Sequence, residues 1–161
     1  MAQTRLDAPS RAPLPPGTLY ARWRSTPQHR LTNLLSDAVV WRVVPLDVLE
    51  LLVFDQCIIF GAVCPHAGDA VNQIARRDAV VMQTRKTLWA IYACAVERIG
   101  RDQRLTLMHE VALAVECGPG SAGSLVAFIK CDPDASIRAA ASARVGALRE
   151  AALPELEAGY N

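Results

Sequence analysis

The apolar run from Leu46 to Val63, LDVLELLVFDQCIIFGAV, constrains the fold of this chain more than any other feature. It is long enough for about five turns of α-helix, and its three carboxylates are too few to form an ordinary polar face. A helix that is apolar almost all round has to be enclosed by other elements. We therefore predict that this segment is the buried central helix of a compact all-α domain.

The rest of the composition also favours helices around such a core. Hydrophobic residues make up 52% of the 161 residues, but Trp, Tyr and Phe occur only three times each, so the apolar content is aliphatic and rich in alanine. This suits close-packed helices better than sheets, and the length fits one domain. We predict five to seven helices over residues 19–153, as a bundle or as stacked antiparallel pairs. Residues 1–18, with four of the ten prolines, are expected to form a flexible arm, and residues 154–161 a C-terminal tail.

Charge and cysteine content limit the cellular context. The net charge is +1, although the first 36 residues carry five Arg and one Asp. Four charged residues interrupt the apolar region 38–63, and each would cost about 2.5–3.5 kcal/mol at the centre of a bilayer, so no membrane span is predicted. Residues 1–20 have no apolar segment of the signal-peptide type. The five cysteines lie in apolar contexts, which is typical of reduced thiols in a cytoplasmic protein.

Two stretches before the central helix can each be interpreted in two ways. Residues 19–30 interleave Tyr20 and Trp23 with arginines, so they either dock on the core or stack on nucleic-acid bases; we favour docking. Residues 31–44 are predicted to be helical, although the β-branched stretch AVVWRVV at 38–44 leaves a strand open.

Helix signals are clearer in the second half of the chain. Heptad spacing predicts a long helix from a cap at Asp69 to a stop at Gly100. Asp102 is expected to cap the next helix, which should run to about Cys117, before the break at residues 118–121. A short helix then ends near Cys131, and an alanine-rich helix from Ala135 is expected to end at Pro154.

The turn before that last helix carries one family resemblance. Asp132-Pro133-Asp134 is followed by apolar and alanine residues at helical spacing, over residues 132–148. This stretch resembles the turn and helix opening of a HEAT-type helical repeat. The resemblance implies stacked antiparallel helix pairs, which in that family usually bind other proteins.

Charged side chains on the long helix are our candidate binding residues. Asp78 and Arg85 fall on or beside its apolar stripe, where a charge needs a partner, and the surrounding residues 76–104 are strongly basic. Such residues either form a solvated face or line a binding site. The residues predicted to contact a partner are Arg76, Arg77, Asp78, Arg85 and Lys86.

No constellation supports a specific chemistry. The stretch beginning His109-Glu110 lacks the second histidine of a zinc protease, because Leu113 occupies that position. Cys64 and His66 would be the residues of a small enzyme with an activated thiol, but we favour a simple turn, which the neighbouring glycine and proline explain. Cys57, Cys64 and His66 lack the ligand number and spacing of a zinc site. No metal or cofactor is predicted.

These observations favour a non-enzymatic protein that binds another protein. Its most concrete form is an immunity protein that neutralises a toxin. A nucleic-acid-binding helical protein and the small enzyme using Cys64 and His66 are the alternatives. A homodimer is left open, and no membrane partner is expected.

Overall fold

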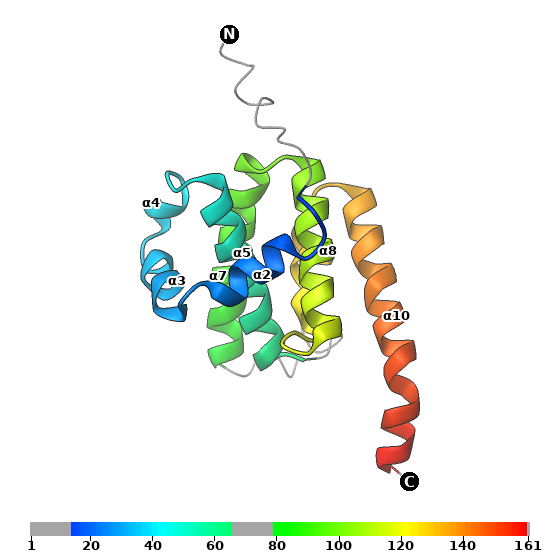
Figure 1. The fold of residues 1–161 in the computed structure, drawn as a ribbon. Helices are drawn as coiled ribbons and strands as arrows, with labels where there is room; N and C mark the ends of the chain where they lie inside the picture. Colours follow the sequence, from blue (N-terminus) through cyan, green and yellow to red (C-terminus); the bar gives the residue numbers. More distant parts are fainter. Residues whose placement is uncertain (1–13, 66–78, 161) are drawn as a thin grey trace.

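A computed structural model describes residues 14–65 and 79–160, where all regular structure is helical (Figure 1). The all-α prediction is confirmed. These residues form more helices than the predicted five to seven, because the segment before the central helix is divided into three short ones: α2 (Thr18–Ser25), α3 (Gln28–Leu35) and α4 (Ala38–Trp41). No helix in the described ranges has the length and apolar character needed to cross a membrane.

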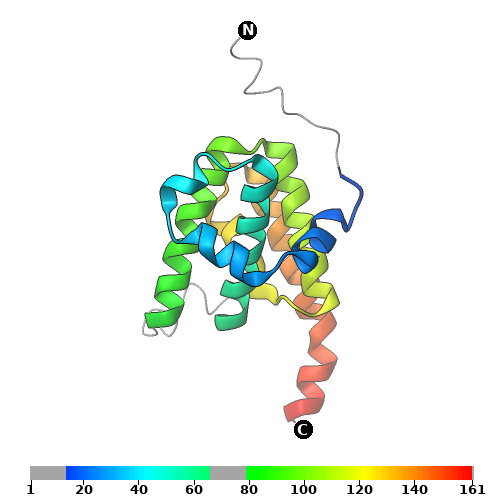
Figure 2. The same ribbon diagram turned by 60° about the vertical axis from the view of Figure 1, so that its left-hand side comes forward.

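The central helix α5 (Leu46–Val63) has the predicted limits. Its side chains at Leu52, Phe54 and Phe60 are fully buried, because neighbours cover it on almost every side (Figures 1 and 2). The described elements around it are α2, α3, α7 (Ala79–Arg98), α8 (Arg101–Cys117) and the short 3-10 helix η2 (Ala122–Leu125). The most apolar of the long described helices therefore lies where it buries the most hydrophobic surface, which is the most favourable place for it.

Residues 31–44 do not form the single predicted helix. Pro27 precedes α3, and Asp37 accepts a hydrogen bond from the Val39 amide to begin α4. This capping bond starts a new helix in a different direction. Ala38–Trp41 is helical, so the alternative of a strand over 38–44 is wrong.

The predicted limits of the long helix and of α8 are partly confirmed. The predicted cap at Asp69 lies outside the described residues. The long helix ends at Arg98, in agreement with the stop predicted at Gly100. Gly100 is also the N-cap of α8, with Gln103 accepting a hydrogen bond from its amide at 3.1 Å. α8 consequently begins at Arg101, and Asp102 lies in its first turn instead of capping it.

A close crossing joins α5 to η2. A Cβ added at Gly123 would lie 1.8 Å from the carbonyl oxygen of Cys64, and one added at Gly61 would lie 2.9 Å from the Ser124 amide. The Ser121 hydroxyl donates to the Gly61 carbonyl at 2.8 Å. Glycines at both positions therefore let two backbones approach directly. The break at Gly118, where φ is +115°, occurs as predicted.

The last two helices are α9 (Val126–Cys131) and α10 (Ala135–Tyr160). The turn at 132–134 joins them, and Asp134 accepts a hydrogen bond from the Ser136 amide at 2.8 Å, as an N-cap does. The predicted end at Pro154 is wrong, because α10 continues to Tyr160. The residues after Pro154 (ELEA) are strong helix formers, and this end of α10 extends away from the body of the protein (Figures 1 and 2).

Candidate functional site

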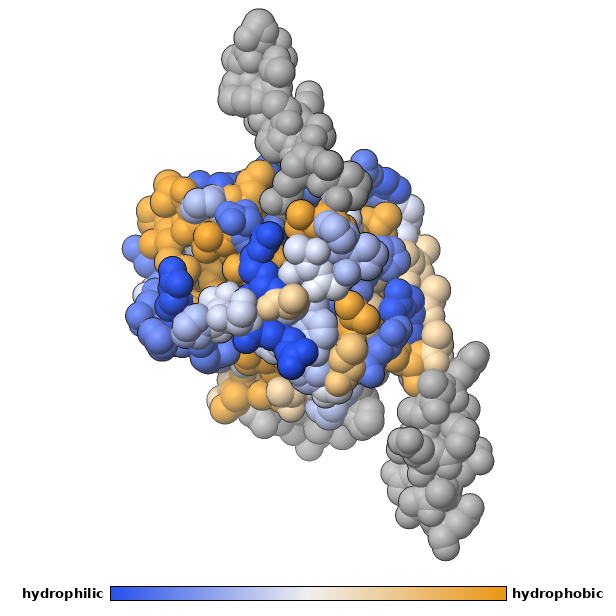
Figure 3. Space-filling view, viewed as in Figure 1, coloured by the Kyte–Doolittle hydropathy of each residue, from blue (hydrophilic) through white to orange (hydrophobic). Residues whose placement is uncertain are grey.

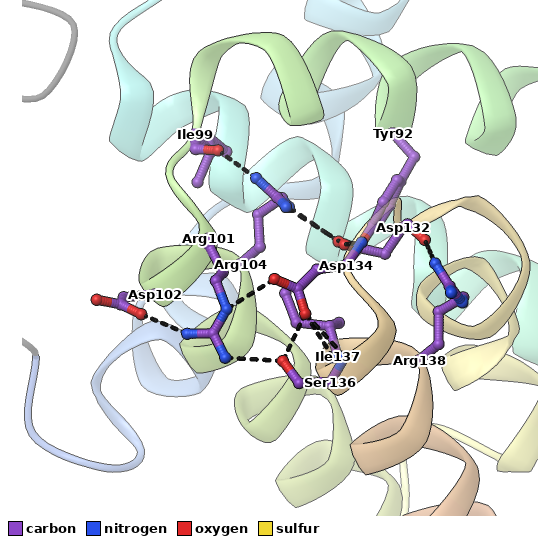
Figure 4. A network of polar contacts seen from close by, with 10 residues as sticks. All are labelled: Tyr92, Ile99, Arg101, Asp102, Arg104, Asp132, Asp134, Ser136, Ile137 and Arg138. Carbon is purple, nitrogen blue, oxygen red and sulfur yellow. Dashed lines mark hydrogen bonds and ion pairs between the residues drawn. The ribbon is translucent and has the colours of Figure 1, made fainter.

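A buried ion pair between Arg104 and Asp132 joins α8 to the turn that follows α9 (Figure 4). The Asp132 carboxylate is 2% exposed and accepts hydrogen bonds from Arg104 Nε at 2.8 Å and from the Tyr92 hydroxyl at 2.6 Å. Arg104 also donates to the Ile99 carbonyl at 2.8 Å. Burial acts to raise the pKa of Asp132, but the Arg104 and Tyr92 hydrogen bonds outweigh it, so the pKa is lowered. A buried charge with this many donors is stable as an anion and has a structural role.

A second layer of polar contacts surrounds this pair. Arg101 Nε donates to Asp134 at 2.7 Å, and its other nitrogens contact Asp102 and Ser136. Hydrogen bonds from Ser136, followed by the Arg101 contact, lower the pKa of Asp134 to about 2. Arg138 donates to the Asp132 carbonyl at 2.9 Å. The basic side chains here thus serve the turn between α9 and α10 (Figure 4).

A buried carboxylate on α8 holds the first helix in place. Glu110 is 4% exposed and accepts hydrogen bonds from the Gly17 amide at 2.8 Å and the Tyr20 amide at 3.0 Å. These are amides at the start of α2 that have no partner within that helix. Glu110 therefore caps α2 from a position 93 residues further along the chain than Gly17.

A second carboxylate, Asp55 on α5, holds the aromatic side chains of α2. It accepts a hydrogen bond from Trp23 Nε1 at 3.0 Å, and burial raises its pKa. The rings of Tyr20, Trp23 and Phe54 stack at centroid separations of 5.2–6.3 Å. Tyr20 is only 9% exposed. The segment therefore docks on the core.

Cys64, the thiol predicted for a small enzyme, does not have the setting of a nucleophile. Cys64 is 3% exposed, and a reactive cysteine needs access and an electropositive surrounding. Burial raises the pKa of Cys57, and raises that of Cys131 to about 11. His66 lies outside the described residues. Within the described part of the chain, no group of three or more His, Cys, Asp or Glu is arranged to hold a metal ion.

Three of the five predicted contact residues, Arg76, Arg77 and Asp78, lie outside the described residues. The other two are on α7, where Arg85 is half-buried and Lys86 is exposed. No salt bridge of either cation with a described residue occurs in the structure. Their role in binding a partner stays a prediction.

The described arginines divide into two groups along the chain. Those at positions 98–144 all donate hydrogen bonds to oxygens of the fold or to His109: Arg98, Arg101, Arg104, Arg138 and Arg144. Those at positions 22–85 donate no side-chain hydrogen bond to a described residue: Arg22, Arg24, Arg30, Arg42 and Arg85. Only Arg24 among these has a described ring contact, over Tyr20 at 5.5 Å.

Exposed apolar side chains lie in the same half of the chain. Among the described residues, the large hydrophobic side chains with the greatest exposure are Val43 (74%), Val39 (67%), Val80 (61%) and Met82 (37%). Figure 3 shows apolar surface gathered where Figure 1 places α4, beside hydrophilic surface over α3. We call Val39, Arg42 and Val43 the α4 corner.

The α4 corner is attached firmly to α7. Arg98 donates to the Trp41 carbonyl at 2.5 Å and to the Val44 carbonyl at 2.6 Å, so it closes the end of α4. Cys94 donates to the same Trp41 carbonyl at 3.4 Å. The Trp41 indole Nε1 is a buried donor for which the described residues supply no acceptor. The corner is thus a fixed surface with one unsatisfied donor beneath it.

Sequence reasoning missed the two buried charges that organise α8. Arg104 lies three residues before the buried Leu107 and four before the buried Met108. Glu110 lies three residues after Leu107 and four before the buried Ala114. That spacing places both charges on the buried face, which was the available signal. Comparisons with protein-family models, curated proteins and solved structures give no match for this chain. The HEAT-type resemblance of residues 132–148 therefore stays a prediction.

Proposed function

We propose that this protein is a non-enzymatic module that binds another protein through the surface formed by α3 and α4. The observation that carries the proposal is the coincidence of exposed valines with arginines that the fold does not use. Arginine and apolar side chains together anchor protein interfaces. The described arginines at positions 98–144 are instead engaged in the fold itself.

An immunity-type protein that neutralises a toxin is the most concrete version of this function. Such a role requires a rigid surface and no catalytic group. The α4 corner supports it, because Arg98 holds its backbone. The five cysteines are all free, which supports action in a reducing compartment such as the cytoplasm.

Nucleic-acid binding is the second candidate, favoured by the same unpaired arginines. It requires affinity that falls steeply with salt, because each phosphate contact releases a counterion. The burial of Tyr20 and the bond from Trp23 to Asp55 remove the stacking platform that single-strand binders use. We therefore rank protein binding first.

Site-specific photo-crosslinking in the cells that produce the protein tests the proposal. A crosslinking amino acid at Val43 is expected to capture one protein in equimolar amount, and the same group at exposed Ala139 on α10 is expected to capture none. Recovery of the untagged complex by affinity purification gives its stoichiometry. Crosslinks to nucleic acid alone, or equal capture from both positions, would refute the proposal.

A further inference from the structure

Two exposed valines share one face of the α4 corner. Val39 and Val43 are 67% and 74% exposed. The amides of Val43 and Val44 donate to the Val40 carbonyl at 3.1 and 3.0 Å, so the helical turn continues beyond α4. Side chains three and four residues apart lie on one side of such a turn, which places Arg42 beside the two valines. This apolar face is favourable to cover, because covering it removes hydrophobic surface from water.

Charges of both signs lie around these valines. Asp47 is exposed in the first turn of α5, the helix that follows the corner, and Glu97 is exposed on α7. Burial raises the pKa of the Cys94 thiol. The charges of Arg98, Glu97 and Arg42 also act on that pKa, so these side chains lie around the point where α7 meets the corner. The surface is therefore mixed in charge, with an apolar centre.

The exposed charges of this surface are not used up within one molecule. Among the described residues, no ion pair includes Arg42, Asp47 or Glu97. Asp47 accepts a hydrogen bond from the adjacent Val48 amide at 2.9 Å through one of its two oxygens. One cation and two carboxylates therefore remain for contacts with another molecule.

From this self-complementary pattern we infer that the free protein associates with a second copy of itself through the α4 corner. Contacts in a two-fold dimer are reciprocal, so the valines of each copy cover those of the other. Arg42 of each copy likewise faces Asp47 and Glu97 of the other. The inference goes beyond the proposed function, because it concerns the protein without its partner. A partner protein at the same surface displaces the second copy.

Partners of a single charge fit this surface less well. A nucleic acid would bring phosphates against Asp47 and Glu97, and a strongly basic segment would meet Arg42. Like charges brought together at an interface oppose association. A second copy supplies both signs in reciprocal positions, together with an apolar face of the same size.

The size of the surface sets the strength expected of the dimer. A stable interface buries about 800 Å² on each partner, and two valines with three charged side chains offer less than this. Small interfaces of this kind belong to weak, reversible complexes. We therefore expect a dimer that dissociates on dilution.

Sedimentation equilibrium of the purified full-length protein tests the inference, over concentrations from about 1 μM to about 1 mM. The average mass is expected to rise from that of one copy toward that of two. Val43→Ser and Arg42→Glu should each raise the dissociation constant about 10-fold, the size of an interface anchor. Both positions are exposed, so circular dichroism should show unchanged folding.

A charge exchange between two variants tests the reciprocal contact. The double variant Asp47→Lys, Glu97→Lys should associate as weakly as Arg42→Glu, because each then brings like charges together. An equimolar mixture of the two is expected to associate at least as strongly as wild type, since every reversed charge again faces its opposite. A purely structural role of these residues could not restore association in the mixture.

Two matched variants serve as controls. Lys130→Glu reverses an exposed charge on α9, and Val80→Ser replaces a valine of similar exposure about 27 Å along α7 from Arg98, at 1.5 Å per residue. Both should dimerise within about 2-fold of wild type, because they lie outside the corner.

Two outcomes would overturn the inference. The mass of one copy at every concentration would exclude the dimer, while capture of a different protein at Val43 in cells would still support the proposed function. Equal losses in Val80→Ser and Val43→Ser, or no recovery in the mixture, would exclude the corner as the interface. A dimer that behaves as expected, without any other protein captured in cells, would support the inference and refute the proposed function.

Discussion

The arginines of α8 and α10 differ from those of α2, α3 and α4 in what their guanidinium groups contact. Arg104 donates to a buried carboxylate and a carbonyl, and is 7% exposed. Arg42 is exposed and makes no described side-chain hydrogen bond. The same residue type therefore stabilises the fold in one region and remains available in the other.

The apolar side chains follow the same division. Around the Asp132 network, Ile137 and Ala141 of α10 are fully buried, whereas Val39 and Val43 stand at the surface. A region whose charged groups are paired and whose apolar side chains are buried offers few groups for contact with a partner. The comparison therefore supports the proposed binding surface in the first half of the described chain.

Removal of one arginine from each region gives the largest expected contrast. Arg104→Ala leaves the Asp132 carboxylate buried without its cation, which should lower the free energy of unfolding by about 3–5 kcal/mol. Arg42→Ala should change it by no more than about 0.5 kcal/mol. Urea denaturation measures both. Similar losses in the two variants would remove the distinction between the regions.

The crossing of α5 and η2 should be nearly as sensitive. Gly123→Ala places a Cβ against the Cys64 carbonyl oxygen, which belongs to the backbone and cannot rotate away, so we expect a loss of about 3 kcal/mol. Gly146→Ala is the matched control, because no atom lies within 4 Å of its added Cβ. It should stabilise helix α10 by about 0.5–1 kcal/mol. Thermal unfolding followed by circular dichroism reports both shifts.

A pair of tryptophan substitutions sharpens the comparison between docked and available surface. Trp23→Phe removes the donor to the buried Asp55 carboxylate and should cost about 1.5 kcal/mol beyond the change in packing. Trp41→Phe removes a donor that has no described acceptor, so no hydrogen bond is lost with it. The difference between the two in chemical denaturation is the measure. A larger cost for Trp41→Phe would contradict this account of the α4 corner.

The smallest expected effect is on how the free energy of unfolding depends on pH under acidic conditions. The pKa of Asp132 is lowered in the folded protein from its ordinary value of 3.8, so the unfolded chain binds more protons between the two values. The free energy of unfolding therefore decreases as pH falls through that window. In Asp132→Asn this dependence is absent, and the slope below about pH 4 should be shallower by up to about 1.4 kcal/mol per pH unit. Parallel curves for the two proteins would contradict a lowered pKa.

The features predictable from sequence were those set by neighbouring residues. The apolar run fixed the limits of α5, and the cap at Asp134 and the break at Gly118 follow from local backbone chemistry. Pro154 was misjudged because one missing amide does not end a helix whose following residues favour it. Asp102 was misjudged as the cap of α8 because Gly100, which follows the end of α7, also begins the next helix.

The candidate site was only partly predictable. Its main signal is that several arginines and valines of one region are exposed and unused by the fold, whereas those of the other region are engaged or buried. Arg85 and Lys86 were chosen from their place on α7, but the exposure of Val39 and Val43 depends on the direction that α4 takes after Asp37. The engagement of Arg104 depends on Asp132, 28 residues away. Pairings at such separation cannot be read from helical spacing, which shows only that a charge lies on an apolar face.

The cap that Glu110 supplies to α2 has a consequence for biosynthesis. Helix α2 is translated before α8, so the Gly17 and Tyr20 amides lack their Glu110 acceptor until residue 110 has been translated. During that interval Tyr20 and Trp23 are unprotected, so α2 is held in place only after α8 has been made. A nascent chain halted before Glu110 should therefore expose α2 to proteases and chaperones.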